Sequence, residues 1–119
     1  MENDVKKLNK KYQKHALKKY DKMIAWAEKQ PAKDNVDYGL MENEIDIAWF
    51  AGDCSYCKFY LFTDEGEREV CPLQGMKTIC CTGDNCCGNK WGIMNQSTTW
   101  GTWIKKAKSV RKYIEEHGV

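Results

Sequence analysis

Apolar residues recur every three or four positions through the first thirty residues, as they do on one face of a helix. They are Val5, Leu8, Tyr12, Ala16, Tyr20, Met23 or Ile24, and Ala27. Lysines fill much of the remaining surface of this segment. Neither glycine nor proline occurs before Pro31, and proline ends a helix. The pattern predicts a long basic helix over residues 1–30.

Two further helices are predicted by the same periodicity. The first covers residues 38–52, with Gly52 as the residue that closes it. Its apolar side consists of Leu40, Met41, Ile45, Ala48 and Trp49. The second covers residues 98–117 with Thr98 as its N-cap. Its apolar side consists of Trp100, Trp103, Ala107, Val110 and Ile114.

The segment between these helices has a different pattern. The stretch KFYLFT is aromatic and typical of a strand, DEGE offers a turn, and REVC can return as a second strand. We therefore expect a short β-hairpin from Lys58 to Cys71. The predicted fold class is α+β, mainly helical, in a single domain over residues 1–119. Long terminal helices would flank the hairpin and a cysteine-rich region at 53–97.

Cysteine content changes the interpretation of that central region. The chain has 119 residues and seven cysteines, all of them between Cys54 and Cys87. The N-terminus is polar and lysine-rich and carries no secretory signal, so a cytoplasmic location is expected. Clustered cysteines in a reducing compartment are more often metal ligands than disulfides, and an odd number fits a closed disulfide framework poorly. No apolar run reaches 18 residues, so no membrane span is expected.

The spacing of the cysteines predicts a structural zinc site. Cys54 and Cys57 form a Cys-x2-Cys pair, whose turn brings both sulfurs to one ion, and Cys71 is the expected third ligand. The fourth ligand comes from the last four cysteines, among which Cys81 is ranked first. The second-ranked candidates are Cys80, Cys86 and Cys87.

Other ligands and metals stay open at this stage. An iron–sulfur cluster also uses four thiolates and is the alternative cofactor. Two zinc ions would require a shared thiolate or a histidine. His117 is the candidate histidine, although a favourable interaction with the helix dipole explains its position at a helix end better. His15, on the lysine-rich helix, is expected to be a surface residue.

The pattern CSYCKFY, CPL, CC and CCGNKW, with a helix before and after it, is similar to small cysteine-rich proteins of bacteriophages and prophages. The resemblance covers about residues 40–115 and rests on Cys54, Cys57, Cys71, Pro72 and Leu73. It implies zinc binding and a viral origin more than an activity, because most of these relatives have no assigned function. The doubled cysteines depart from the family pattern.

Charge is distributed unevenly along the chain. Nine lysines against four acids give residues 1–30 a balance of +5, residues 31–70 have a balance of −7, and residues 71–119 return to +4. The segments can neutralise one another, which is the interpretation we favour, or they can present separate patches. In the second case Lys7, Lys11, Lys14 and Lys18 are candidate partner-binding residues. Trp91 is a further candidate because an exposed tryptophan marks an interface.

These observations favour a protein that binds a macromolecule and is not an enzyme. No activated nucleophile, open metal position or phosphate-binding loop is evident, and neither is a small-molecule substrate. The expected partner is a host or viral protein, with inhibition of a host defence protein as an example. A nucleic-acid-binding zinc module and a thiol redox protein are the alternatives. A membrane partner is not expected.

Overall fold

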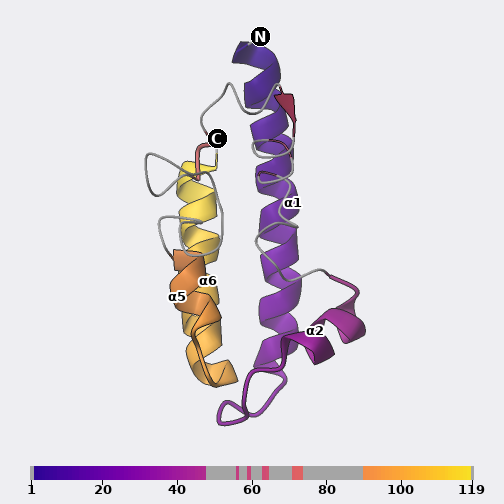
Figure 1. Ribbon diagram of the computed structural model, residues 1–119, viewed down its shortest axis with the longest axis vertical. Coiled ribbons are helices and arrows are strands. Elements are labelled where there is room, and N and C mark those ends of the chain that lie inside the picture. The colour runs from indigo at the N-terminus through magenta and orange to yellow at the C-terminus, as the bar shows by residue number, and fades with distance from the viewer. Residues whose placement is uncertain are drawn as a thin grey trace.

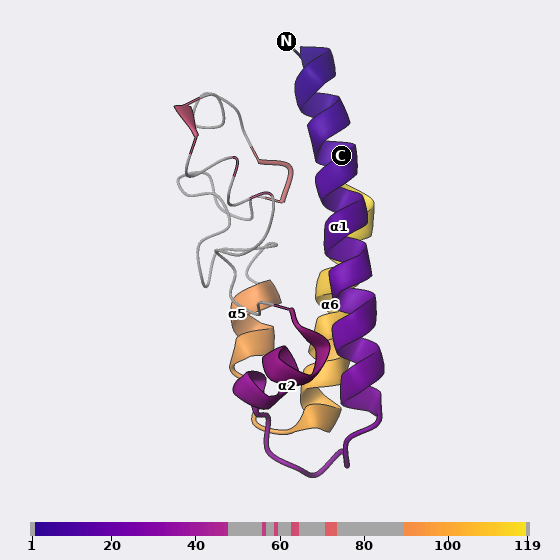
Figure 2. The ribbon, with the colours of Figure 1, turned by 90° about the vertical axis from the view of Figure 1, so that its right-hand side faces the viewer.

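The structure is a computed structural model that describes residues 2–47, 56, 59, 63, 64, 71–73 and 90–118. This part of the chain is mainly helical, and the helices with described bounds are α1 (Glu2–Glu28), α2 (Tyr38–Ile45), α5 (Lys90–Asn95) and α6 (Trp100–His117). Helices α1 and α6 lie side by side and define the long axis, while α2 and α5 lie near the end at which α1 finishes (Figures 1 and 2).

Helix α1 confirms the long N-terminal helix and ends two residues before the expected position. Its sequence is rich in lysine, which loses little freedom in a helix, and contains neither glycine nor proline. The backbone N–H groups of Lys29 and Gln30 bond to the carbonyls of Trp26 and Ala27, which tightens the end of the helix. Pro31 then disfavours a helical conformation at Gln30.

Helices α1 and α6 form an antiparallel pair whose shared interface is the centre of the core. The expected apolar face of the C-terminal helix is confirmed, since Trp100, Trp103, Ala107, Val110 and Ile114 are all buried. They pack in one cluster with α1 residues, including Met23 and Ala27. At the other end of the pair, the Gln13 side-chain amide donates to the carbonyls of Ile114 and Glu115 at 3.1 and 3.0 Å.

The loop after α1 fixes the start of α6 through the backbone. The N–H groups of Trp100 and Gly101 donate to the carbonyls of Asp34 and Ala32, at 3.1 and 3.0 Å. Thr99 is the N-cap of α6, in place of the expected Thr98, and its side chain makes no capping hydrogen bond. The carbonyl of Thr98 instead accepts from the N–H of Val36.

Helix α2 begins where expected and ends earlier. Asp37 caps it, accepting a hydrogen bond from the N–H of Leu40 at 3.0 Å. The helix closes at Asp46, which adopts the left-handed conformation with φ 53°. Aspartate tolerates this conformation better than most residues. The predicted end at Gly52 therefore moves to Ile45, and Gly52 itself lies outside the described residues.

The expected β-hairpin and the α+β class are wrong. Phe59, the second residue of the predicted first strand, is helical, and so is Asp64. The Thr63 hydroxyl donates to the Phe59 carbonyl at 2.6 Å, which is the four-residue spacing of a helical turn. The Phe59 ring packs against Tyr12 of α1 with centroids 5.9 Å apart. Because strand propensity mostly reflects how a side chain packs, this contact outweighs the aromatic character of the segment.

Helix α5 was not anticipated. It buries Trp91, Gly92 and Met94, and it packs along α6. The Lys90 ammonium donates to the Ser109 hydroxyl at 3.1 Å. In the described part of the chain the one β feature is an isolated antiparallel bridge between Asn35 and Thr99.

Candidate functional site

Of the predicted zinc ligands, Cys71 is the one that the structure describes. Its side chain is 2% exposed and belongs to the hydrophobic core, together with the fully buried Leu73. The predicted ligands Cys54, Cys57 and Cys81 lie outside the described residues, as do Cys80, Cys86 and Cys87. Among the residues that are described, no group of three or more His, Cys, Asp or Glu side chains could hold a metal ion. The zinc site therefore stays a prediction.

Tyr56 connects the Cys-x2-Cys segment to the helical pair. It stands between Cys54 and Cys57 in the sequence, and its side chain is fully buried. Its hydroxyl lies between two backbone carbonyl oxygens, 3.1 Å from that of Asn9 and 2.6 Å from that of Gly118. One side chain thus joins α1 to the residue that follows α6.

The surroundings of Tyr56 leave little room for change. Its ring packs edge-on against Tyr12 at 5.5 Å. A Cβ atom at Gly118 would lie 2.7 Å from the Tyr56 hydroxyl and 2.5 Å from the Ile114 carbonyl oxygen. Sequence reasoning missed Tyr56. The available signals were an aromatic residue inside a cysteine pair and a glycine at the end of a helix.

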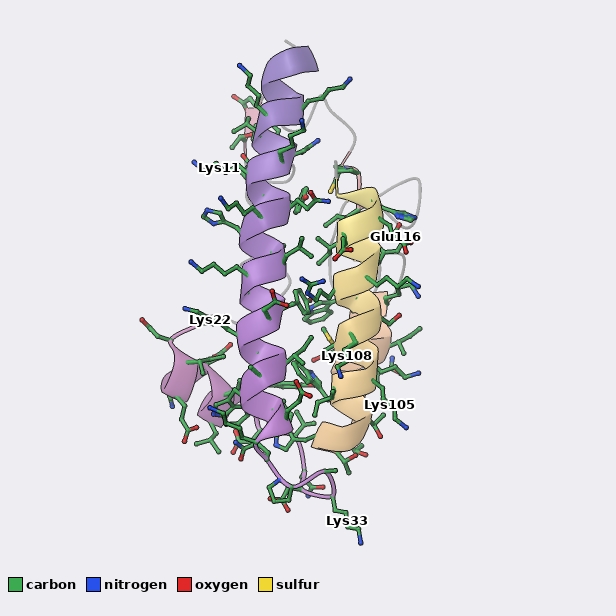
Figure 3. The ribbon with its side chains drawn as sticks, turned by 180° about the vertical axis from the view of Figure 1, so that it is seen from behind. Lys11, Lys22, Lys33, Lys105, Lys108 and Glu116 are labelled. Carbon is green, nitrogen blue, oxygen red and sulfur yellow. The ribbon has the colours of Figure 1, made fainter. Side chains whose placement is uncertain are left out.

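The four predicted partner-binding lysines of α1 lie in one exposed row, and Lys22 also belongs to this row. The lysine row consists of Lys7, Lys11, Lys14, Lys18 and Lys22, all of them exposed. Lys18 and Lys22 come two residues after the buried Ala16 and Tyr20, which places them roughly 200° around the helix from the core. Lys11 and Lys22 point away from the α1–α6 interface (Figure 3).

Two acids of α1, Asp21 and Glu28, pair with α6 and not with the lysine row. The Asp21 carboxylate accepts from the Arg111 guanidinium at 2.6 Å, and Glu28 lies 3.8 Å from the Lys108 ammonium. The hydrogen bond that Arg111 donates to Asp21 is the largest cause that raises the pKa of Arg111, followed by the one that it donates to Glu115. In the part of the chain that the structure describes, no lysine of the row makes an ion pair. Mutual neutralisation, the favoured interpretation, does not hold for these five lysines within this part.

A shallow hollow lies beside the lysine row near α2. It is lined by His15, Lys18, Lys19 and Lys22 of α1 and by Ile47, which follows α2. His15 is exposed, as expected of a surface residue. Lysine and histidine side chains of α1 line one part of the hollow, and the apolar side chain of Ile47 lines another.

Two other candidates, Trp91 and His117, make their contacts within the protein. Trp91 is only 6% exposed and contributes to the core between α5 and α6, so its indole is not a surface anchor for a partner. His117 lies in the last turn of α6 and stacks on Tyr113, with ring centroids 4.2 Å apart. These positions move the candidate site from the tryptophans to the outer face of α1.

Comparison with protein families, curated proteins and solved structures found no match to this chain. No helix in the described part is both long enough and apolar enough to cross a membrane.

Proposed function

We propose that this protein is a non-catalytic binder that holds the phosphate backbone of double-stranded nucleic acid along the lysine row of α1. One observation carries the proposal: five exposed lysines share one face of α1, while Asp21 and Glu28, the acids of that helix whose side chains the structure describes, pair with α6. Lysines that neutralise phosphates release the counterions condensed on the duplex, which supplies most of the affinity of sequence-independent binding.

The dimensions of the row suit a duplex backbone. Lys7 and Lys22 are fifteen residues apart, so the row is about 22 Å long at 1.5 Å per residue. At 3.4 Å per base pair this matches about six or seven base pairs. Neighbouring lysines in the row are three or four residues apart, which keeps their side chains on the same surface.

Side-chain types on this face favour phosphate contacts over base contacts. Bases are read in the major groove by Arg or Lys on guanine and by Asn or Gln on adenine, and the row offers only Lys, which binds phosphate as a point charge. Single strands are held largely by stacking on aromatic side chains, and no aromatic residue belongs to the row. The proposed binding is therefore independent of sequence and directed to the duplex.

A protein partner, the leading expectation from the sequence, has less support. Protein interfaces are enriched in Trp, Tyr and Arg and depleted in Lys. The tryptophans in the described part of the chain are all buried, and they are Trp26, Trp91, Trp100 and Trp103. An acidic host or viral protein that binds the lysine row becomes an outcome of the test below.

In this proposal the cysteine region is a scaffold that holds structural zinc through Cys54, Cys57, Cys71 and one of the last four cysteines. The burial of Cys71 supports this role, and so does the attachment of Tyr56 to both long helices. The proposed location is the cytoplasm, where nucleic acid is available and free thiols persist.

Fluorescence anisotropy with labelled duplexes of unrelated sequence tests the proposal. Replacing Lys11 and Lys14 with glutamine is expected to weaken binding at least about tenfold, since charged hydrogen bonds are lost. Replacing Lys105 and Lys106 with glutamine is the matched control, because it removes the same charge from exposed positions of α6. Equal losses in both pairs, or binding of an acidic protein in place of any duplex, would contradict the proposal.

A further inference from the structure

The first half of α1 carries cations over a wider part of its circumference than the lysine row alone covers. Residues 6–15 contain five lysines and no acid. All five lysines are exposed, and within the part of the chain that the structure describes none of them makes an ion pair. Three of them belong to the lysine row. The other two, Lys6 and Lys10, form a second group that we term the lysine flank.

The lysine flank lies where α6 ends. The Gln13 side-chain amide donates to two carbonyls in the last turn of α6, and α1 extends beyond this point (Figure 1). Lys6 precedes Gln13 by seven residues, or about two turns, which places both on the same side of the helix. Lys10 precedes Leu17, which packs against the core, by the same interval. The side of α1 that packs within the protein over its second half is therefore cationic and exposed over its first half.

The lysine flank and the lysine row together form a cationic arc on this half of α1. Lys6 and Lys11 lie at its two edges. The five residues between these positions, at about 100° each, amount to one full turn and about 140°, so the edges are about 140° apart. Tyr12, whose ring contacts Tyr56 of the cysteine region, lies about 170° from the middle of the arc. Through this contact the cysteine region meets α1 on the side opposite the arc.

The width of the arc suits the major groove of B-form DNA. This groove is about 12 Å wide and admits an α-helix, whose diameter with side chains is about 10–12 Å. A helix in the groove has the phosphates of one strand on each side, so the cations at both edges of the arc have partners. The minor groove, about 6 Å wide, is too narrow for a helix. The major groove of an RNA duplex is deep and narrow, and side chains cannot read it.

We propose that the first half of α1 lies in the major groove of duplex DNA, with Lys7 and Lys11 against the phosphates of one strand and the lysine flank against those of the other. The inference rests on the proposed function and names its nucleic acid as DNA in preference to RNA. Beyond the groove, Lys14, Lys18 and Lys22 continue along the backbone of the first strand. An RNA duplex offers one backbone to the lysine row and no second backbone to the lysine flank.

Anisotropy titrations with a DNA duplex and an RNA duplex of corresponding sequence and equal length test the inference. At the same salt concentration we expect the DNA duplex to bind at least about tenfold more tightly, because the lysine flank adds charged hydrogen bonds that the RNA duplex does not accept. The affinity for the RNA duplex then measures the lysine row alone. Equal affinity for the two duplexes, or tighter binding of RNA, would overturn the inference.

Matched obstacles in the two grooves identify the groove that is occupied. One DNA duplex carries a bulky neutral group in place of the C5-methyl of its thymines, which lies in the major groove. A second carries the same group on N2 of its guanines, which lies in the minor groove. We expect the first modification to lower the affinity to that of the RNA duplex and the second to leave it unchanged. A major-groove group without effect would contradict insertion of α1.

Variants locate the preference for DNA on α1. Lys6→Gln combined with Lys10→Gln is expected to lower the affinity for DNA to that for RNA and to leave binding of RNA unchanged. Lys18→Gln combined with Lys22→Gln is the matched control, because it removes the same charge from exposed positions of the lysine row and should weaken both duplexes alike. Lys6→Arg combined with Lys10→Arg keeps both cations and should keep the preference. Equal weakening of both duplexes by the glutamine variant of the lysine flank would overturn the inference.

The outcomes separate this inference from the proposed function. If DNA and RNA duplexes bind equally through the lysine row, the proposed function stands and the major-groove assignment is wrong. If neither duplex binds, both are wrong. If DNA binds more tightly and the lysine flank accounts for the difference, both are supported.

Discussion

The Tyr56 hydroxyl lies 2.6 Å from the carbonyl oxygen of Gly118, a residue 62 positions away in the sequence. The approach is close because Gly118 has no side chain, and its φ of −72° is an ordinary value for any residue. The glycine is therefore required for space and not for backbone conformation. This contact attaches the cysteine-rich segment to the end of α6.

Gly118→Ala is expected to destabilise the fold. The added Cβ would clash with the Tyr56 hydroxyl and the Ile114 carbonyl, and overpacking of this kind typically costs about 1–3 kcal/mol. Gly39→Ala is the control, since a Cβ there would lie 3.6 Å from Asp37 at normal contact distance. Alanine within the exposed helix α2 should be neutral or stabilising by up to about 1 kcal/mol. Urea unfolding compares the two, and equal stability of both variants would contradict the account.

Tyr56→Phe tests the hydroxyl separately from the ring. The ring keeps its edge-on contact with Tyr12, while the single hydroxyl proton between the carbonyl oxygens of Asn9 and Gly118 is lost. Leaving a buried acceptor unpaired costs about 1–3 kcal/mol. We expect the free energy of unfolding to fall by that amount, measured by urea. A variant as stable as the wild type would show that water replaces the hydroxyl at no cost.

Alkaline pH is expected to weaken the contact between α2 and α5. The Tyr38 hydroxyl donates to the Asn95 carbonyl at 3.3 Å, and burial raises the pKa of Tyr38 to about 12. The unfolded chain has the ordinary pKa of about 10, so the folded state holds this proton more tightly. The stabilising contribution is complete below about pH 10 and is lost as the pH rises toward about 12.

Tyr38→Phe separates this effect from general alkaline denaturation. The variant should lose less stability than the wild type between about pH 10 and 12, measured as the urea midpoint at each pH. Tyr12 is a second contributor, because burial also raises its pKa. Identical pH profiles for wild type and Tyr38→Phe would contradict the assignment.

Metal analysis with thiol counting tests the proposed zinc scaffold. We expect about one zinc per chain in native protein. Chelation is expected to unfold the cysteine region and make Cys71, now 2% exposed, accessible to a thiol reagent. Cys54→Ser or Cys57→Ser should have the same effect. A folded, metal-free protein in which all seven thiols react freely would contradict the scaffold.

The two long helices could be predicted from the sequence because their apolar residues repeat with helical spacing over many turns. The buried face of α6 followed directly from that spacing. The end of α2 could not be predicted, because Asp46 and Gly52 are both able to close a helix and the local sequence does not choose between them. Helix α5 was missed because it is short and contains Gly92 within a segment without periodicity.

Contacts between distant segments explain the remaining differences. Phe59 has the residue type of a strand, but its packing against Tyr12 favours a helical conformation. Tyr56 could not be identified as an anchor because its partners are 47 and 62 residues away. The lysine row was predictable from its spacing. The pairing of Asp21 with Arg111, and not with a lysine of the row, was not predictable, since it depends on how the two long helices pack.

The salt dependence of duplex binding tests the central claim most directly. If the five lysines of the row contact phosphates, the logarithm of the association constant should fall with the logarithm of salt concentration with a slope of about −4 to −5. Lys14→Gln should reduce the magnitude of this slope by about 0.9. A slope near zero, or one that Lys14→Gln leaves unchanged, would contradict binding of nucleic acid by the lysine row.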